Sequence, residues 1–326
     1  VPVDSNRGVC VMALPVLAKT WQYAENQAVA AQGSGLATMR RVIRTIVDSM
    51  LGFASTPWTI IGSSNAVASG MDAVYRWATD ADVIWSGGAH SWVVLQQTGI
   101  STTFQVCFDL NSSSSQMVVV ASTAGFTGGT TSARPTAVDE VVTLNATWCS
   151  NLDITHKVNV CQASDGSATR IFVLAASTTL TTFFMFDKPV NTISGWTDPY
   201  MVTTRGISSG IPVTQLSHLS QTASFGRRTT AMALYWTGEY CGNYPLASVS
   251  SLGAVANEIN SEWELYPIGL ACLTTGNRGR VGSLVDIWWK AESVGHGDTF
   301  PLDGSRQFLA IGGLVVPWSG VVPQMA

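Results

Sequence analysis

Hydrophobic residues recur at steps of three and four in one long segment of the chain, residues 35–51. The apolar positions of this segment share one helical face: Leu36, Met39, Val42, Ile43, Ile46, Val47 and Met50. Three arginines, Arg40, Arg41 and Arg44, fall largely on the opposite face. This spacing predicts an amphipathic α-helix that is stopped by the glycine at position 52.

After residue 57 the apolar residues occur in short runs bounded by turn residues, which is typical of β-strands. Strands are predicted over residues 58–62, 82–85, 91–97, 102–109, 116–121, 138–144, 156–162, 168–176, 178–186, 229–237, 281–290 and 308–317. Residues 163–167 contain Asp-Gly, a strong hairpin signal, and residues 295–305 are predicted as a loop between two strands. Residues 258–273 begin polar and become apolar, which fits a short helix leading into a strand.

The order of these elements predicts a mainly β chain, which we class as β-rich α+β. No fixed-period repeat is present, which disfavours solenoids and propellers. Many short strands with few helices predict an antiparallel β-sandwich-like body with an N-terminal amphipathic helix. The expected division is an N-terminal arm and helix over residues 1–57 and a β-rich body over residues 58–326. The turn-rich stretch 190–228 marks a candidate break between two sub-domains.

Composition restricts the function classes. Of 326 residues only 12% are charged and 46% are hydrophobic, the formal net charge is -4, and Ser and Thr number 34 each. This balance excludes a coiled coil, a basic nucleic-acid binder and a charge-driven disordered chain. A surface with so little charge fits a protein that buries much of itself against copies or partners. An extracellular β protein with a Thr- and Ser-rich surface is the equal alternative.

The cysteines indicate the compartment. They number six, at positions 10, 107, 149, 161, 241 and 272, and none forms a C-x-x-C pair. Their place in apolar runs predicts buried free thiols and folding in a reducing cytoplasm. The start of the chain lacks the pattern of a signal peptide, and the apolar runs are shorter than a membrane span. We therefore expect a soluble protein that is made in the cytoplasm.

One string matches a catalytic motif. Residues 206–210 read Gly-Ile-Ser-Ser-Gly, the G-x-S-x-G pattern of a nucleophile elbow centred on Ser208, with Asp286 and His296 later in the required order. The elbow needs a helix directly after the serine, and Pro212 interrupts one. The chain also lacks the alternating strands and helices of an α/β-hydrolase. We therefore expect no nucleophilic role for Ser208.

The other candidate chemistry is weak. The four histidines, His90, His156, His218 and His296, lack the spacing of a metal site, so ordinary strand or loop positions are expected. Many aspartates sit in turns, where they usually bond the backbone. A pair of carboxylates that hydrolyses a glycan stays an alternative, because the distance between two carboxylates is a three-dimensional property that the sequence does not give. No catalytic, cofactor-binding or metal-binding residue is predicted, and the protein is expected not to be an enzyme.

Twelve tryptophans are the other unusual feature of the composition. Trp288 and Trp289 are adjacent in a predicted strand, so their side chains must point to opposite faces. One of them then needs cover from a second layer or subunit, and a sugar-binding platform is the less favoured explanation. The interface candidates are Trp288, Trp289, Trp92 and Trp318.

Several strings resemble virion structural proteins of tailed bacteriophages. They are residues 20–22 (Thr-Trp-Gln), 57–65, 70–72, 76–77, 89–99, 164–170, 186–189 and 297–308. The resemblance implies a repeated structural component of the particle, with tail or baseplate favoured over head decoration, assembled in the host cytoplasm. Its partners would be copies of itself and other virion proteins, with no cofactor, nucleic acid or membrane. A receptor- or glycan-binding module on the virion is the first alternative, and a glycan hydrolase is the second.

Overall fold

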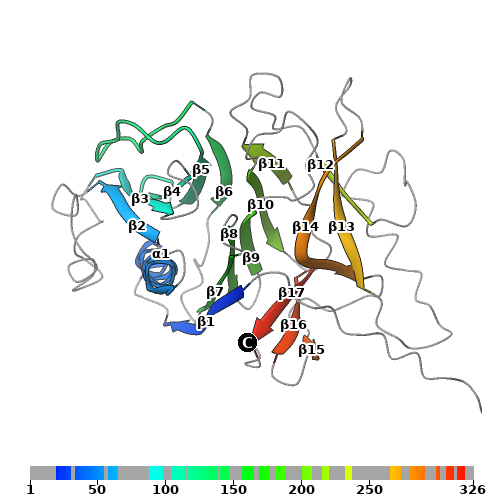
Figure 1. Ribbon diagram of the computed structural model, residues 1–326. Helices are drawn as coiled ribbons and strands as arrows, with labels where there is room; N and C mark the ends of the chain where they lie inside the picture. Colours follow the sequence, from blue (N-terminus) through cyan, green and yellow to red (C-terminus); the bar gives the residue numbers. More distant parts are fainter. Residues whose placement is uncertain are drawn as a thin grey trace, which may run out of the picture.

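Strands in antiparallel sheets make up most of the described chain, with one helix among them (Figure 1). This much of the predicted mainly β fold is confirmed. The computed structural model describes residues 20–30, 34–54, 58–64, 88–97, 104–114, 116–138, 140–146, 156–164, 169–176, 181–187, 200–207, 215–219, 232–236, 265–272, 279–290, 299–301, 306–311 and 314–319.

The strands form three sheets, which we name after one central strand each. The β8 sheet has the order β1 (Thr20–Val29), β7 (His156–Ser164), β8 (Thr169–Ala176), β9 (Thr181–Asp187), β10 (Tyr200–Ile207) and β11 (Gln215–Leu219). The β4 sheet has the order β2 (Trp58–Ser63), β3 (His90–Gln97), β4 (Gln105–Asn111), β5 (Gln116–Ser122) and β6 (Val141–Ala146). The β14 sheet has the order β12 (Met232–Trp236), β13 (Leu265–Cys272), β14 (Gly279–Lys290), β17 (Leu314–Ser319), β16 (Arg306–Ile311) and β15 (Thr299–Pro301).

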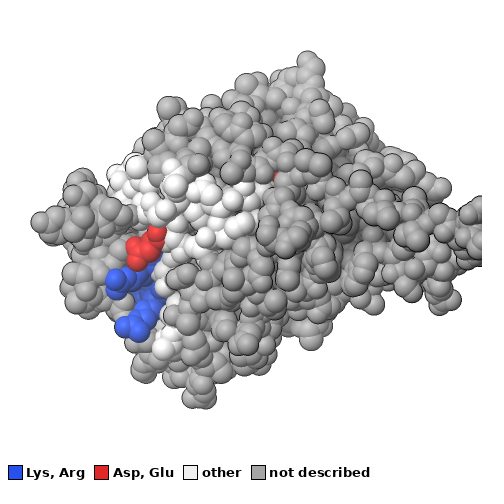
Figure 2. All heavy atoms as spheres, turned by 60° about the horizontal axis from the view of Figure 1, so that its bottom comes forward, with Lys and Arg blue, Asp and Glu red and all other residues white. Residues whose placement is uncertain are grey.

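The predicted helix is confirmed as α1 (Gly35–Gly52). Ser34 caps it, because its hydroxyl oxygen accepts a hydrogen bond from the Ala37 amide at 3.2 Å. Its arginines and Asp48 lie on the other side from the buried face, and Arg44 and Asp48 are 3.6 Å apart. On the face that Figure 2 shows, the charged side chains of the described residues gather in one cluster of basic and acidic groups, with one small acidic spot apart from it. No helix of the described residues is long and apolar enough to cross a membrane.

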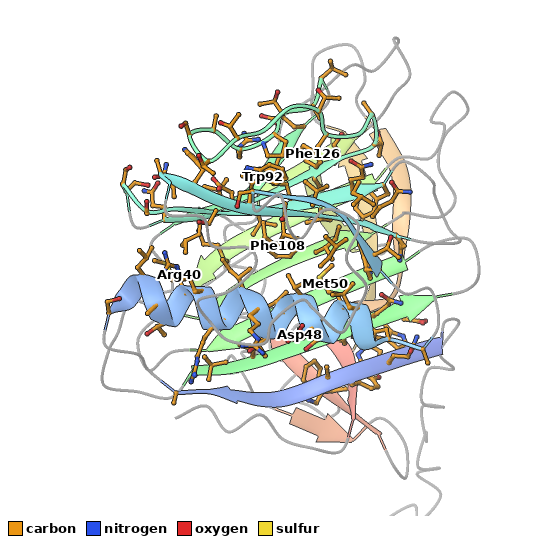
Figure 3. All side chains as sticks on the ribbon, turned by 90° about the vertical axis from the view of Figure 1, so that its left-hand side faces the viewer. Arg40, Asp48, Met50, Trp92, Phe108 and Phe126 are labelled. Atoms are coloured by element: carbon orange, nitrogen blue, oxygen red, sulfur yellow. The ribbon has the colours of Figure 1, made fainter. Side chains whose placement is uncertain are left out.

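The main core lies between the β4 sheet and the β8 sheet, with α1 in the middle (Figure 3). Met39, Ile46 and their neighbours on the apolar face of α1 pack with Phe108 from β4 and Val160 from β7. Each fully buried side chain of this kind contributes about 1.5–3 kcal/mol. Trp58 of β2 joins the two sheets directly, because its indole Nε1 donates a hydrogen bond to Gln162 Oε1 at 3.0 Å.

The central strands of the β4 sheet, β3, β4 and β5, are buried on both faces. Alternation along β4 directs Phe108 toward α1 and Cys107 to the opposite, outer face. The residues between β5 and β6, residues 123–138 with Glu140, cross the outer face, and we call them the strap. Under the strap, Cys107 packs in a second apolar cluster with Trp92 and Val120. Figure 3 shows Trp92 and Phe126 on this side of the sheet and Phe108 on the side of α1.

Some predicted elements have different bounds in the structure. Residues 308–317 were predicted as one strand, but they fall in two paired strands, β16 and β17. The predicted loop 295–305 includes the short strand β15, and the turn-rich stretch 190–228 includes β10 and β11. The strand predicted at 138–144 is β6, which begins three residues later. Residues 82–85 and 258–264 lie outside the described residues, and the proposed domain division stays a prediction.

Candidate functional site

The strap is held on the outer face of the β4 sheet by hydrogen bonds from three positions. The Trp92 indole Nε1 donates to the Thr130 carbonyl at 2.9 Å, and the His90 amide donates to the Thr131 carbonyl at 2.9 Å. At the other end, the Phe126 amide donates to Gln105 Oε1 at 2.8 Å. The strap therefore has a fixed position on β3 and β4, although it contains no regular strand.

Bonds within the strap give it a defined shape. Thr127 and Thr136 exchange two backbone hydrogen bonds, and Thr130 and Ala133 close the tip. Arg134 forms two parallel hydrogen bonds with the Glu140 carboxylate, at 2.9 and 2.8 Å. These bonds to Glu140 are the main cause of a raised pKa of the Arg134 guanidinium. Such a bidentate pair fixes geometry as well as charge.

Two glycines allow the strap to lie this close to the sheet. Gly129 has a φ of 100°, and a Cβ atom there would lie 2.6 Å from Cζ2 of Trp92. A Cβ atom on Gly88 would lie 2.3 Å from the Thr131 carbonyl oxygen. Both positions therefore need glycine, Gly129 also because a side chain rarely adopts its backbone conformation.

A histidine–aspartate pair lies beside the tip of the strap. His90 Nδ1 and Asp109 Oδ2 are 2.8 Å apart. Asp109 is fully buried, and its second oxygen, Oδ1, has no hydrogen-bond partner. Burial raises the pKa of Asp109, and the hydrogen bond and charge of His90 oppose this effect. The pair therefore places a carboxylate in a position where a buried charge is costly.

Cys107 lies on the same face of β4, two residues from Asp109. It is a fully buried free thiol, and burial first and the Asp109 charge second raise its pKa well above the ordinary value. A thiol with a raised pKa is a poor nucleophile, so Cys107 acts here as a small apolar side chain.

The outer surface of the strap is exposed, and its described exposed residues carry no charge. Its exposed residues are Ala124, Thr127, Gly128, Gly129, Thr130, Thr131, Ser132, Ala133, Thr136 and Val138. Val138 is 87% exposed, which is the largest value among the exposed large apolar side chains described. Beside it lies an open hollow of about 270 Å³, lined by Ala124, Gly125, Thr127, Thr136, Ala137 and Val138.

Two of the four predicted interface tryptophans have described side chains. Trp92 is 6% exposed and lies under the strap, and Trp318 is fully buried with its ring centroid 5.8 Å from that of Tyr23. Their cover in this chain is intramolecular. Trp288 and Trp289 lie in β14, as predicted, opposite Val315 and Leu314 of β17. Their side chains are not among those that the structure describes. The interface role of these tryptophans stays a prediction.

The described residues do not test the elbow motif. Ser208 and His296 lie outside the described residues. Asp286 lies in β14, where its Oδ2 accepts a hydrogen bond from the Trp21 indole at 3.2 Å. His156 and His218 lie in β7 and β11. Within the described chain no group of three His, Cys, Asp or Glu side chains could hold a metal ion.

Asp109 is the member of the histidine–aspartate pair that the sequence did not single out. It is the one charged residue in the apolar run 104–110, in phase with Cys107 on a face that alternation alone would expose. From the sequence alone, a charged residue at this position is expected to face solvent, because no covering segment can be recognised. The strap supplies that cover, but its Gly-, Thr- and Ser-rich sequence gives no sign of packing.

No protein-family model matches the chain, and no curated protein matches it.

Proposed function

We propose that this protein is a structural component of a tailed-bacteriophage virion that assembles with copies of itself, with tail or baseplate favoured over head decoration. In this proposal its sheets pack as a sandwich-like body and it performs no catalysis. The resemblance of the strings in residues 20–22, 57–65 and 297–308 to such proteins supports the proposal. Its other partners would be neighbouring proteins of the same particle.

The observation that carries the assembly proposal is the uncharged outer surface of the strap. Ten exposed strap residues carry no charge, and the two charged strap side chains that are described, Arg134 and Glu140, neutralise each other. The surface of a small soluble domain is ordinarily about 25–35% charged, which limits association. A surface that is uncharged and also held in one shape by hydrogen bonds is suited to contact a second copy of the chain.

The described tryptophans give no support to the glycan-binding alternative. Trp58, Trp92 and Trp318 are buried, and Trp21 donates its indole N–H to Asp286. A sugar platform needs an open aromatic face, which the three buried rings do not offer, and the half-buried Trp21 ring is stacked on that of Tyr23. The described residues accordingly favour assembly over glycan binding.

Adding charge to the strap tests the proposal. Ser132→Lys and Val138→Lys each place a cation on the exposed strap, and Ala54→Lys places the same charge on an exposed residue after α1. Sedimentation at micromolar concentration should show an oligomer for the wild type and for Ala54→Lys. Both strap variants should shift to monomer at unchanged melting temperature, because a repeated interface would bring the added cations together.

A wild-type protein that sediments as a monomer would refute self-assembly. Oligomers that survive both strap lysines would refute the strap as the contact surface. In the second case the tryptophan-bearing β14 would be the next surface to test.

A further inference from the structure

The His90–Asp109 pair lies directly below the anchor points of the strap tip. His90 contacts the strap through its backbone amide, which donates to Thr131, and contacts Asp109 through its ring. Asp109 is paired in register with Trp92, whose indole donates to Thr130. The His90–Asp109 pair therefore includes one of the two residues that hold the tip and lies opposite the other in the strand register.

Protonation changes the charge of this buried pair. When His90 is protonated, its cation neutralises the Asp109 carboxylate through a charge-assisted hydrogen bond. When His90 is neutral, Asp109 keeps a full buried charge on a carboxylate whose Oδ1 has no hydrogen-bond partner. Loss of the proton should therefore disfavour the closed position of the strap.

The other titratable and charged groups near Asp109 do not reverse this direction. They are Cys107 on β4 and Arg134 and Glu140 on the strap. Cys107 is neutral because burial raises its pKa, and Arg134 is already paired with Glu140. Burial is also the largest cause of the raised pKa of Asp109, so the folded chain holds that proton more tightly than the unfolded chain. Its stabilisation is present at acid pH and lost as the pH rises through the raised pKa.

We propose that the strap is a protonation-dependent cover, closed on the outer face of the β4 sheet at mildly acid pH and opening more often as the His90–Asp109 pair loses its proton. Opening would uncover the apolar cluster of Trp92, Cys107 and Val120. The inference concerns the single chain, so it goes beyond the proposed assembly and does not depend on it.

Alkylation of Cys107 reports opening of the strap, because this thiol is fully buried beneath it. Cys161, a fully buried free thiol on β7, is an internal reference on another sheet. The folded protein is alkylated at several pH values from about 5 to 8, and peptide mass spectrometry gives the Cys107 to Cys161 labelling ratio. This ratio cancels the intrinsic pH dependence of thiol alkylation. We expect it to rise about tenfold across this range.

Three variants assign the effect. Asp109→Asn removes the buried charge and should give a low, pH-independent ratio. His90→Asn keeps an N–H donor but cannot form the charged pair with Asp109, so its ratio should exceed that of the wild type at the acid end of the range. Glu140→Gln removes the titratable partner of Arg134 and should keep the pH dependence of the wild type. A constant ratio in the wild type would overturn the proposal, as would an unchanged pH dependence in Asp109→Asn or a His90→Asn ratio equal to that of the wild type at the acid end. The wild-type ratio decides alone if a variant does not fold.

Discussion

At the scale of single residues, the close approach of the strap to the sheet depends on glycines, which have no side chain. Gly128 and Gly129 both have positive φ, 71° and 100°. They differ in surroundings, since a Cβ atom on Gly128 would meet nothing within 4 Å and one on Gly129 would meet Trp92. The two neighbours therefore separate the cost of backbone conformation from the cost of a steric clash.

We predict that Gly129→Ala destabilises the fold more than Gly128→Ala. The Gly128 variant should cost about 1 kcal/mol, because an alanine must adopt the left-handed region. The Gly129 variant should cost about 3 kcal/mol, because it also overpacks the Trp92 ring. Urea unfolding followed by tryptophan fluorescence measures both free energies. Equal costs would contradict the observed packing of the strap on Trp92.

The requirement for glycine at position 129 could not be predicted from the sequence. Its contact, Trp92, lies on a different element, and the local string Thr-Gly-Gly-Thr reads as an ordinary loop. The same holds for Asp109, which is buried on a face of β4 that alternation along the strand would leave exposed. Single residues were predictable where their role depends on local periodicity, as for Met39 and Ile46 of α1.

At the scale of elements, α1 was predictable because its apolar residues repeat with a helical period, and its apolar face from Met39 to Met50 is buried. Strands β3, β4 and β5 were also predictable, because turn residues bound apolar runs. The pair β16 and β17 was predicted as one strand, since the apolar residues continue across Gly312-Gly313. A Gly-Gly pair between strands favours a two-residue hairpin, but the prediction followed the continuous apolar run instead of this turn signal.

We predict that the start of α1 depends on Ser34. Ser34→Ala should lower the free energy of unfolding by about 1 kcal/mol, because the Ala37 amide loses its side-chain acceptor. Ser34→Asp should retain most of the stability, since a carboxylate caps the helix and favours its N-terminus. Chemical unfolding of the three proteins measures the effect. A Ser34→Asp protein that is as unstable as Ser34→Ala would argue against capping at this position.

At the scale of the whole molecule, β1 connects the three sheets. It pairs with β7, and its Val29 is part of the core around α1. Its Tyr23 ring lies edge-on to Trp318 of β17, and its Trp21 donates to Asp286 of β14. The sequence could not predict this role, because residues 20–29 carry no clear period and their partners lie more than a hundred residues away. Long-range pairing of this kind follows from topology, which local patterns do not encode.

Asp286 is the strained member of the contact between β1 and β14. Its φ is 60°, and it lies where the pairing of β13 with β14 shifts between Pro267 and Gly269. A non-glycine residue in this region is uncommon, and Asp and Asn tolerate it better than most. The conformation is thus compatible with a side chain that turns toward β1 and accepts from the Trp21 indole.

We predict that Asp286→Ala costs about 2–4 kcal/mol of folding free energy. Alanine removes the acceptor of a part-buried indole N–H and must also adopt the left-handed region. Asp286→Asn keeps an acceptor oxygen and tolerates that backbone, so its cost should be about 1 kcal/mol or less. Asp48→Ala is the control, because it removes an exposed carboxylate paired with Arg44 and should change stability by about 0.5 kcal/mol or less.

Chemical unfolding gives the four free energies, and hydrogen exchange of the backbone amides of β1 and β14 locates the change. In Asp286→Ala, exchange should accelerate in both strands, because each loses its tie to the other sheet. If Asp286→Ala is as stable as Asp48→Ala, the contact does not hold β1 to β14. If Asp286→Asn is as unstable as Asp286→Ala, the negative charge stabilises the contact, and neither acceptor geometry nor backbone tolerance is sufficient. A large loss of folding free energy in Asp286→Ala without one in Asp286→Asn is the result expected if the contact needs a neutral acceptor on a residue that tolerates the left-handed conformation.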